Sequence, residues 1–227
     1  MIFVTGDTHG RIERISENES LKALGEGDYL IVCGDFGFVL ATKGTMNYFA
    51  EYEDILRLEA LPYTVLFVDG NHENFDRLNA YPEEIWNGGK VHRIGKNILH
   101  LMRGQVFEIE GKRIFTMGGA HSFDKFIRTE GLSWWSAEIP NVDELAEAKR
   151  NLERFNNTVD YVITHTAPRA GIAALGFDVA DDEIPLTELL DYVLENVSFK
   201  RWYFGHWHTD RKIDERLFAI YNYVDEI

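Results

Sequence analysis

The sequence predicts an α/β protein, because short apolar runs typical of buried strands alternate with segments that have helical spacing. The runs are rich in Val, Ile, Phe and Tyr, and each stops abruptly at Gly, Asp or His. They comprise residues 2–5, 29–33, 65–68, 161–164 and 202–204. Runs without polar alternation suit strands that are buried on both faces, so we expect these five to be central strands.

Three intervening segments carry apolar residues at helical spacing. The first contains Phe49, Tyr52 and Leu56, the second follows a cap at Asn141, and the third follows Pro185. An Asn before the first apolar position and a Pro at the first turn are typical of helix starts. We therefore expect helices that cover the sheets in layers.

A second group of apolar runs is separated by short turns and predicts hairpin strands. These runs are residues 98–101, 106–109, 114–117, 211–213 and 217–221. Segments 118–140 and 166–184 lack periodicity, and we expect them to be ordered loops that shape function, as long loops in compact domains often do. No repeat or linker divides the chain, so we expect residues 1–227 to form a single domain.

The bulk composition narrows the class of protein. Hydrophobic residues make up 45% of the 227 residues, which is ample for a core, and the net charge of −15 disfavours binding to long nucleic acids. Nucleotides stay possible, since bound cations would create a local positive site. The single cysteine, Cys33, lies in an apolar run and is expected to be buried. With no leader and no membrane span expected, we predict a cytoplasmic location.

Polar side chains follow each of the five predicted central strands. They are Asp7 and His9, Asp35, Asn71 and His72, His165, and His206 and His208. Because ligand sites in helix-covered sheets form at the carboxyl ends of strands, we expect these residues to meet at one edge. Imidazole and carboxylate donors together suit a transition metal. Neighbouring glycines would permit the tight turns that aim such side chains inward.

Five short blocks of sequence also carry a resemblance to a known family. They are Gly6-Asp7-Thr8-His9-Gly10, Gly34-Asp35, Gly70-Asn71-His72-Glu73, His165 and Gly205-His206-Trp207-His208. In this order they resemble the calcineurin-like metallophosphoesterases, and they span residues 6–208, almost the whole chain. Any one block is weak, but five in order are highly specific. The resemblance implies a four-layer α/β/β/α sandwich of two mixed sheets flanked by helices, the metallo-dependent phosphatase fold.

The resemblance further implies a centre of two divalent metal ions. One ion would be held by Asp7, His9 and His208 and the other by Asn71, His165 and His206, with Asp35 bridging both. His72 would be the catalytic histidine that protonates the leaving oxygen. We expect the ions to be Mn or Fe, with Zn, Co or Ni as alternatives, because His, Asp and Asn accept all of them.

Charge balance supports hydrolysis of phosphate esters at such a centre. Two divalent ions bring four positive charges and the carboxylates of Asp7 and Asp35 return two negative ones, so phosphoryl oxygens would be attracted. A hydroxide formed there near neutral pH could attack phosphorus in line. General acid catalysis by His72 would add about 10²–10⁴-fold.

Three further residues are candidates for binding a small phosphorylated substrate. His121 follows a predicted strand and Gly118-Gly119-Ala120, and its alternative role is a local turn contact. Arg128 and Arg169 offer planar forks of donors for phosphate oxygens. The alternative for each arginine is a solvent-exposed salt bridge.

The sequence leaves the type of ester open. Gly34-Asp35 continues as Phe36-Gly37-Phe38, without the Asp-Arg-Gly of the Ser/Thr phosphoprotein phosphatase branch, so we expect a small phosphodiesterase or phosphomonoesterase. A nucleotide or short nucleic-acid phosphodiesterase or nuclease, and a Ser/Thr phosphoprotein phosphatase-like enzyme, are alternatives. A non-catalytic protein-binding module is the least favoured, because all the presumed ligands and His72 are present. The oligomeric state is not indicated.

Overall fold

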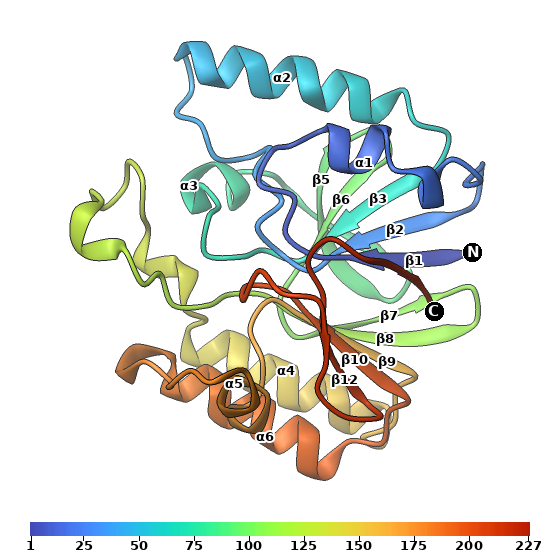
Figure 1. Cartoon of the computed structure of the whole chain (residues 1–227), viewed down its shortest axis with the longest axis vertical. Helices are drawn as coiled ribbons and strands as arrows, with labels where there is room; N and C mark the ends of the chain where they lie inside the picture. The colour runs from blue at the N-terminus through green and yellow to red at the C-terminus, as the bar shows by residue number, and fades with distance from the viewer.

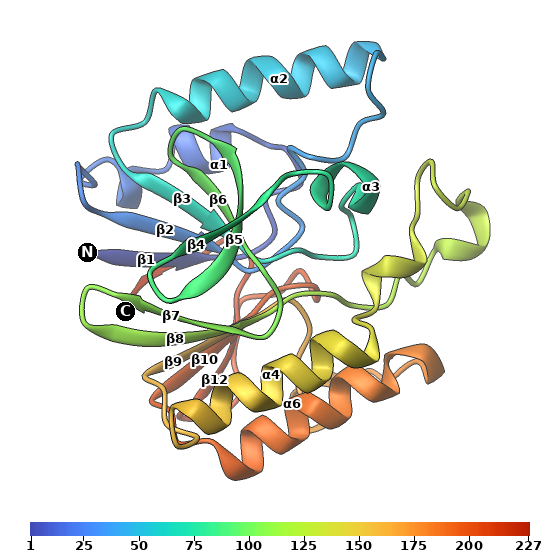
Figure 2. The same ribbon diagram turned by 180° about the vertical axis from the view of Figure 1, so that it is seen from behind.

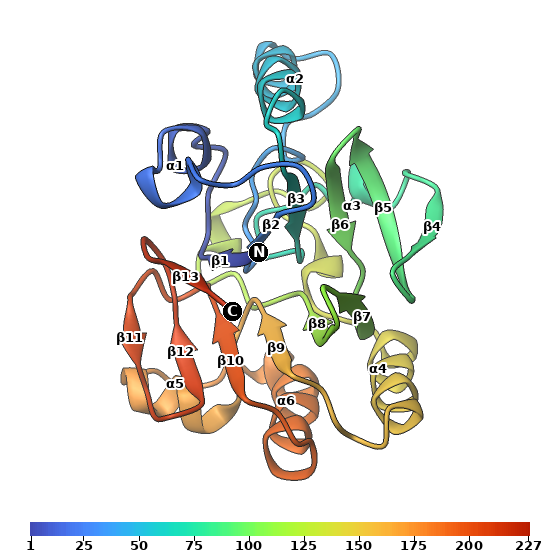
Figure 3. The same ribbon diagram turned by 90° about the vertical axis from the view of Figure 1, so that its right-hand side faces the viewer.

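Two β-sheets packed face to face form the centre of the molecule, and helices cover the outer face of each sheet (Figure 1). The computed structural model describes residues 1–227. Figure 3 looks along the layers and shows the two sheets between α2 (Met46–Glu59) on one side and α6 (Ile184–Asn196) on the other. The expected α/β/β/α sandwich of two mixed sheets is thus confirmed. That residues 1–227 form one domain stays a prediction.

The first sheet has seven strands. In spatial order they are β13 (Val224–Glu226), β1 (Ile2–Thr5), β2 (Tyr29–Val32), β3 (Thr64–Phe67), β6 (Ile98–Leu101), β5 (Gly89–Gly95) and β4 (Glu83–Trp86). Strands β1, β2, β3 and β6 are parallel, whereas β13, β5 and β4 are antiparallel to their neighbours. Thr5 pairs with Val32, and Val32 pairs with Phe67. The carboxyl ends of β1, β2 and β3 are therefore level at one edge.

The second sheet has six strands. In spatial order they are β11 (Arg211–Lys212), β12 (Leu217–Ala219), β10 (Arg201–Phe204), β9 (Tyr161–Thr164), β8 (Lys112–Met117) and β7 (Gln105–Ile109). Strands β12, β10, β9 and β8 are parallel, and the two edge strands are antiparallel. Met117 pairs with Thr164, which pairs with Phe204, so β8, β9 and β10 also end level.

Helices cover the outer face of each sheet. The first sheet is covered by α1 (Glu13–Ser16), α2 and α3 (Phe75–Leu78), with η1 (Glu19–Leu21) beside α1, and the second by α4 (Val142–Arg154), α5 (Arg169–Leu175) and α6 (Figures 1 and 2). Asn141 caps α4 as expected, in a reciprocal capping box with Glu144. Pro185 lies in the first turn of α6. No helix has the length and apolar character needed to cross a membrane.

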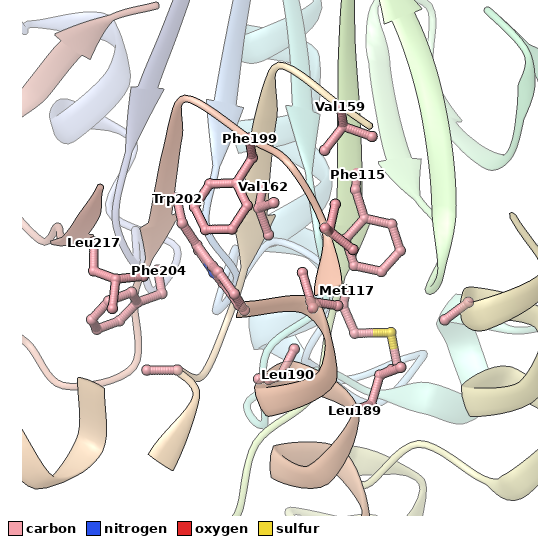
Figure 4. Close-up of a cluster of buried hydrophobic side chains, with 14 of the residues drawn as sticks. Phe115, Met117, Val159, Val162, Leu189, Leu190, Phe199, Trp202, Phe204 and Leu217 are labelled. Atoms are coloured by element: carbon pink, nitrogen blue, oxygen red, sulfur yellow. The ribbon is translucent and has the colours of Figure 1, made fainter. Parts of the chain in front are cut away.

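Apolar clusters hold the layers together. The middle cluster joins the sheets and includes Ile31 of β2 and Ile163 of β9. Neighbouring positions face outward instead, so that Val162 and Trp202 lie in a cluster with Leu190 of α6 (Figure 4). Burial of both strand faces explains why the central strands read as uninterrupted apolar runs.

One hairpin prediction is wrong. Residues 98–101 do not pair with 106–109, because β6 joins β3 and β5 in the first sheet whereas β7 joins β8 in the second. The chain crosses from one sheet to the other in the short connection between β6 and β7, and a short connection in the sequence does not reveal which sheet follows. The pairs β7–β8 and β11–β12 are antiparallel hairpins as expected.

The two segments expected to be loops contain short helices. Segment 118–140 includes η2 (Lys125–Ile127) and η3 (Ser136–Glu138) and extends away from the sheets in Figure 1, and segment 166–184 includes α5 and η4 (Asp181–Glu183). The sequence pattern missed α5 because that helix is short and rich in Ala and Gly. It also missed β4, β5 and β13, of which β4 is a partly exposed, acidic edge strand.

Candidate metal centre

The level strand ends bring the seven candidate ligands together. They follow β1 (Asp7, His9), β2 (Asp35), β3 (Asn71), β9 (His165) and β10 (His206, His208). Both sheets therefore contribute side chains to the same edge of the sandwich. The structure gathers the residues where the sequence predicts, and their role as ligands stays a prediction.

Four of these residues form a first cluster. Nε2 of His9 lies 2.8 Å from Nε2 of His208, which lies 3.2 Å from Oδ2 of Asp7. Nε2 of His9 also lies 3.8 Å from Oδ2 of Asp35. One ligand atom from each of the four residues lies within 4.8 Å of the others. Such convergence of two imidazoles and two carboxylates suits a transition-metal ion.

The remaining three residues form a second cluster beside the first. Nε2 of His165 lies 3.0 Å from Oδ1 of Asn71 and 3.5 Å from Oδ1 of Asp35. The ring of His206 is centred 5.0 Å from that of His165. Asp35 thus directs one carboxylate oxygen towards each cluster, which is the position expected of a bridging ligand.

The backbone of the candidate ligands is strained. His9, Asp35, His206 and His208 have φ angles of 50°, 45°, 66° and 46°, in the left-handed region that residues other than glycine rarely adopt. Such conformations persist only where the surrounding structure imposes them, and they concentrate at functional sites. Four of the seven candidate ligands share this property.

Two glycines allow the backbone to approach the carboxylates closely. A Cβ atom at Gly70 would lie 2.0 Å from Oδ1 of Asp35, and one at Gly205 would lie 2.1 Å from Oδ1 of Asp7. The N–H of His72 donates to Asp35 at 2.8 Å, and the residue after Gly205 donates its N–H to Asp7 at 3.0 Å. These hydrogen bonds fix both carboxylates in place.

The charges of the centre favour a cation. Burial by itself would raise the pKa of Asp7, but hydrogen bonding with His208 and the charge of His165 lower it overall. Burial also disfavours the charged form of His165, yet Asp35 and Asp7 raise its pKa. By contrast, burial and the neighbouring His165 hold the pKa of His206 well below its usual value. His206 is therefore a neutral imidazole next to the buried carboxylate of Asp7.

The orientation of two histidines fits metal binding. Nδ1 of His165 donates to the carbonyl oxygen of the buried Cys33 at 2.8 Å, which leaves Nε2 free to act as a ligand. Nε2 of His206 is buried and has no hydrogen-bond partner. A buried polar atom without a partner is costly, and coordination of a metal ion would satisfy it. The residues present therefore fit a centre of two divalent ions.

His72 lies beside the first cluster, with its ring centred 5.5 Å from that of His9. Arg128 reaches it from segment 118–140: Nη1 lies 2.9 Å from Nδ1 of His72, and Asp124 accepts a 2.7 Å hydrogen bond from Nη2. Burial lowers the pKa of His72, an effect that Asp35 opposes and Arg128 reinforces. The structure thus brings Arg128 together with the catalytic candidate.

The other two candidate substrate contacts lie in different surroundings. Arg169 pairs with Glu188 and Asp191 of α6 at 3.4 and 3.5 Å, and its side chain is 45% exposed. This is the exposed ion pair that the sequence leaves as the alternative, and it does not bring Arg169 to the ligands. Nδ1 of His121 lies 2.7 Å from Oδ1 of Asp182, in a local contact between the two long segments.

Several residues of segment 118–140 that the sequence does not single out lie next to the ligands. The ring of Phe123 stacks on that of His206 with centroids 5.6 Å apart, while 54% of Phe123 remains exposed. Ser122 and Glu138 form hydrogen bonds that lead to Asn71. Their segment has no periodicity, and its only signal is that it follows a predicted strand.

The fold and this cluster of side chains are typical of proteins that bind metal ions at the edge of a two-sheet sandwich. The sequence model of the family described as calcineurin-like phosphoesterase matches residues 1–210. Because this match covers most of the chain, the chain belongs to the calcineurin-like phosphoesterases, a family of metal-dependent hydrolases of phosphate esters. The resemblance seen in the five sequence blocks is therefore confirmed.

Comparison with individual proteins gives more distant similarities. The lariat debranching enzyme of Drosophila melanogaster is 26% identical over 234 residues, which cover 91% of this chain and 42% of that protein. The lariat debranching enzyme of Drosophila pseudoobscura pseudoobscura is 29% identical over 142 residues, or 56% of this chain and 25% of that protein. A solved Staphylococcus aureus structure described as a 5′-nucleotidase has 15% identity and a TM-score of 0.48, covering 96% of this chain and 48% of its own. The chain thus spans less than half the length of these proteins.

Proposed function

We propose that this protein hydrolyses phosphate esters with two divalent metal ions held by Asp7, His9, Asp35, Asn71, His165, His206 and His208. The observation that carries the proposal is the buried Nε2 of His206, which has no hydrogen-bond partner although the main-chain N–H of the same residue donates to the buried Asp7. A purely structural histidine would be expected to have a hydrogen-bond partner there. Family membership supports the same class of reaction.

When bound, the ions would polarise the phosphate and make a hydroxide available from water near neutral pH. The chain's own residues would do the remaining work. Arg128 offers donors to the non-bridging oxygens, and a bound phosphate is a better acceptor for this guanidinium than the imidazole of His72. Once Arg128 binds the phosphate, its hydrogen bond to His72 is lost, and the negative charge of the substrate lies nearby. Both changes would favour protonated His72, which would then donate its proton to the leaving oxygen.

Metal-dependent turnover is the first expected outcome. Metal-stripped protein resupplied with Mn²⁺ should bind two ions per chain and hydrolyse bis-p-nitrophenyl phosphate, p-nitrophenyl phosphate or both, and the preferred ester would distinguish a diesterase from a monoesterase. Parallel titrations with Fe²⁺, Zn²⁺, Co²⁺ and Ni²⁺ would rank the metals, of which we propose Mn or Fe. If the stripped protein binds none of these ions, the proposal fails.

A second candidate is a phosphodiesterase that acts on nucleotides or short nucleic acids. The half-exposed ring of Phe123 beside His206 favours it, because bases stack on aromatic side chains at a gain of about 1–3 kcal/mol each. The ring of Phe177 packs at a tilt against Trp207, which also contacts Phe123, and this extends the aromatic surface. The names of the Drosophila relatives support the same substrate class.

Replacing Phe123 by leucine tests this candidate. Loss of a stacking partner should lower kcat/KM about 10-fold for thymidine 5′-p-nitrophenyl phosphate, since 1.36 kcal/mol corresponds to tenfold. Methyl p-nitrophenyl phosphate, which has the same leaving group but no base, should change less than twofold. Phe49→Leu on α2 is the matched control, because Phe49 is 55% exposed and Phe123 is 54% exposed. Equal losses on both esters would rule out base stacking.

The net charge and the single cysteine bear on the size of the substrate and on the location of the protein. We propose a small phosphorylated substrate rather than a long nucleic acid, because the net charge of −15 opposes binding to a polyanion outside the metal centre. The single, buried Cys33 supports a cytoplasmic location.

A further inference from the structure

The side chain of Asn71 has different partners on its two sides. Its Oδ1 lies 3.0 Å from Nε2 of His165, inside the candidate metal centre, and its Nδ2 lies 3.0 Å from Oγ of Ser122, outside it. Only the oxygen of an amide can bind a metal ion, because the nitrogen lone pair is delocalised and the nitrogen carries two hydrogens. The function of Asn71 therefore depends on which way its amide points.

Ser122 can select that direction because Glu138 fixes its hydroxyl proton. The N–H of Ser122 donates to Oε1 of Glu138 at 2.9 Å, and its Oγ donates to Oε2 at 2.5 Å. With its proton committed to Glu138, the hydroxyl can only accept from Asn71. An acceptor at this position favours Nδ2 over Oδ1, so the oxygen of Asn71 turns towards His165.

The support behind Ser122 is itself held firmly. Asn71, Ser122 and Glu138 are 4%, 1% and 0% exposed. Burial raises the pKa of Glu138, and the hydrogen bonds from Ser122 oppose that shift and favour the carboxylate. Arg103 donates to the main-chain oxygen of Glu138 at 3.2 Å. Ser122 and Glu138 therefore connect the two ends of segment 118–140 and also hold a fixed hydrogen-bond acceptor next to Asn71.

We infer that Ser122 and Glu138 are positioning residues that orient the amide of Asn71, and that segment 118–140 thereby sets the affinity of the second metal site. This inference rests on the proposed function. The inference adds a role for segment 118–140, which contains no candidate ligand. This segment would control binding of the ion at the second cluster, whereas binding at the first cluster would not depend on it. Groups that support a metal ligand in this way typically contribute 10–100-fold in affinity.

The test is a Mn²⁺ titration of Ser122→Ala, followed by the electron paramagnetic resonance signal of free Mn²⁺, which measures affinity without turnover. We expect one of the two sites to weaken about 10–100-fold and the other to stay within threefold of the wild type. Ser133→Ala is the matched control, because Ser133 lies in the same segment and its hydroxyl accepts only from the main-chain N–H of Thr129. Two unchanged affinities in Ser122→Ala, or equal losses in both variants, would overturn the inference.

A double-mutant cycle with Asn71→Asp separates orientation from packing. A carboxylate presents an oxygen on either side and needs no orienting partner, so Ser122→Ala should change Mn²⁺ affinity less than threefold in that background. If the loss caused by Ser122→Ala is the same with Asp at position 71, Ser122 acts by packing alone and the inference is wrong. If the wild type binds neither Mn²⁺ nor any of Fe²⁺, Zn²⁺, Co²⁺ and Ni²⁺, the proposed function itself fails and the inference falls with it.

Discussion

Asp35→Asn is expected to remove most of the phosphoesterase activity. Asp35 directs one oxygen towards each cluster, with Oδ2 3.8 Å from Nε2 of His9 and Oδ1 3.5 Å from Nε2 of His165. Asparagine keeps the size but removes the negative charge and one of the two acceptor oxygens. Metal ions contribute several kcal/mol of transition-state stabilisation, so kcat/KM should fall by about 10³-fold or more.

The measurement pairs kcat/KM for bis-p-nitrophenyl phosphate with the number of bound Mn²⁺ ions. The variant should bind fewer than two ions at concentrations that saturate the wild type. Asp191→Asn is the matched control, because it removes one negative charge from the partly exposed ion pair between Asp191 of α6 and Arg169 of α5. Circular dichroism should show both variants folded. Wild-type occupancy and turnover in Asp35→Asn would exclude the bridging role.

His72→Ala is expected to lower kcat by about 10²–10⁴-fold while both metal ions stay bound. The imidazole lies next to His9 and Arg128. A general acid matters most when the leaving oxygen is a strong base. The loss should therefore be largest for alkyl or nucleoside leaving groups and smaller for p-nitrophenolate, which departs readily without a proton.

The dependence on the leaving group is the internal control for His72. A uniform loss across phosphodiesters that differ only in their leaving alcohol would mean that His72 binds or orients the substrate. Loss of a bound Mn²⁺ ion would mean instead that it acts as a ligand. Either result would remove the proton-donor role from His72.

The positions of the candidate ligands could be predicted from sequence because each depends only on the apolar run that directly precedes it. An apolar run buried on both faces marks a central strand, and the residues that follow it must lie at the sheet edge. Asp7, Asp35 and His165 are found this way without knowledge of strand order. The apolar runs do not indicate which sheet a strand joins, so the crossing between β6 and β7 cannot be predicted from them.

The surroundings of the ligands were harder to predict. Ser122 and Glu138 meet Asn71 through a segment without periodicity, and their contact depends on how that segment returns to the core. Arg169 is a contrasting case, whose role in substrate binding stays a prediction. Its residue type suits phosphate binding, but its place on α5 pairs it with Glu188 and Asp191 of α6, which lie 19 and 22 residues further along the chain.

Each proposed ion would draw its ligands from both sheets. In the first cluster, Asp7, His9 and Asp35 come from the first sheet and His208 from the second, and the second cluster is likewise shared. Metal loading would consequently act as a cross-link between two layers whose centre is an apolar cluster. Occupancy of the centre would then couple the stability of the sandwich to the supply of metal, since a ligand that binds only the native state adds a stabilising free energy that rises with the logarithm of its concentration above Kd.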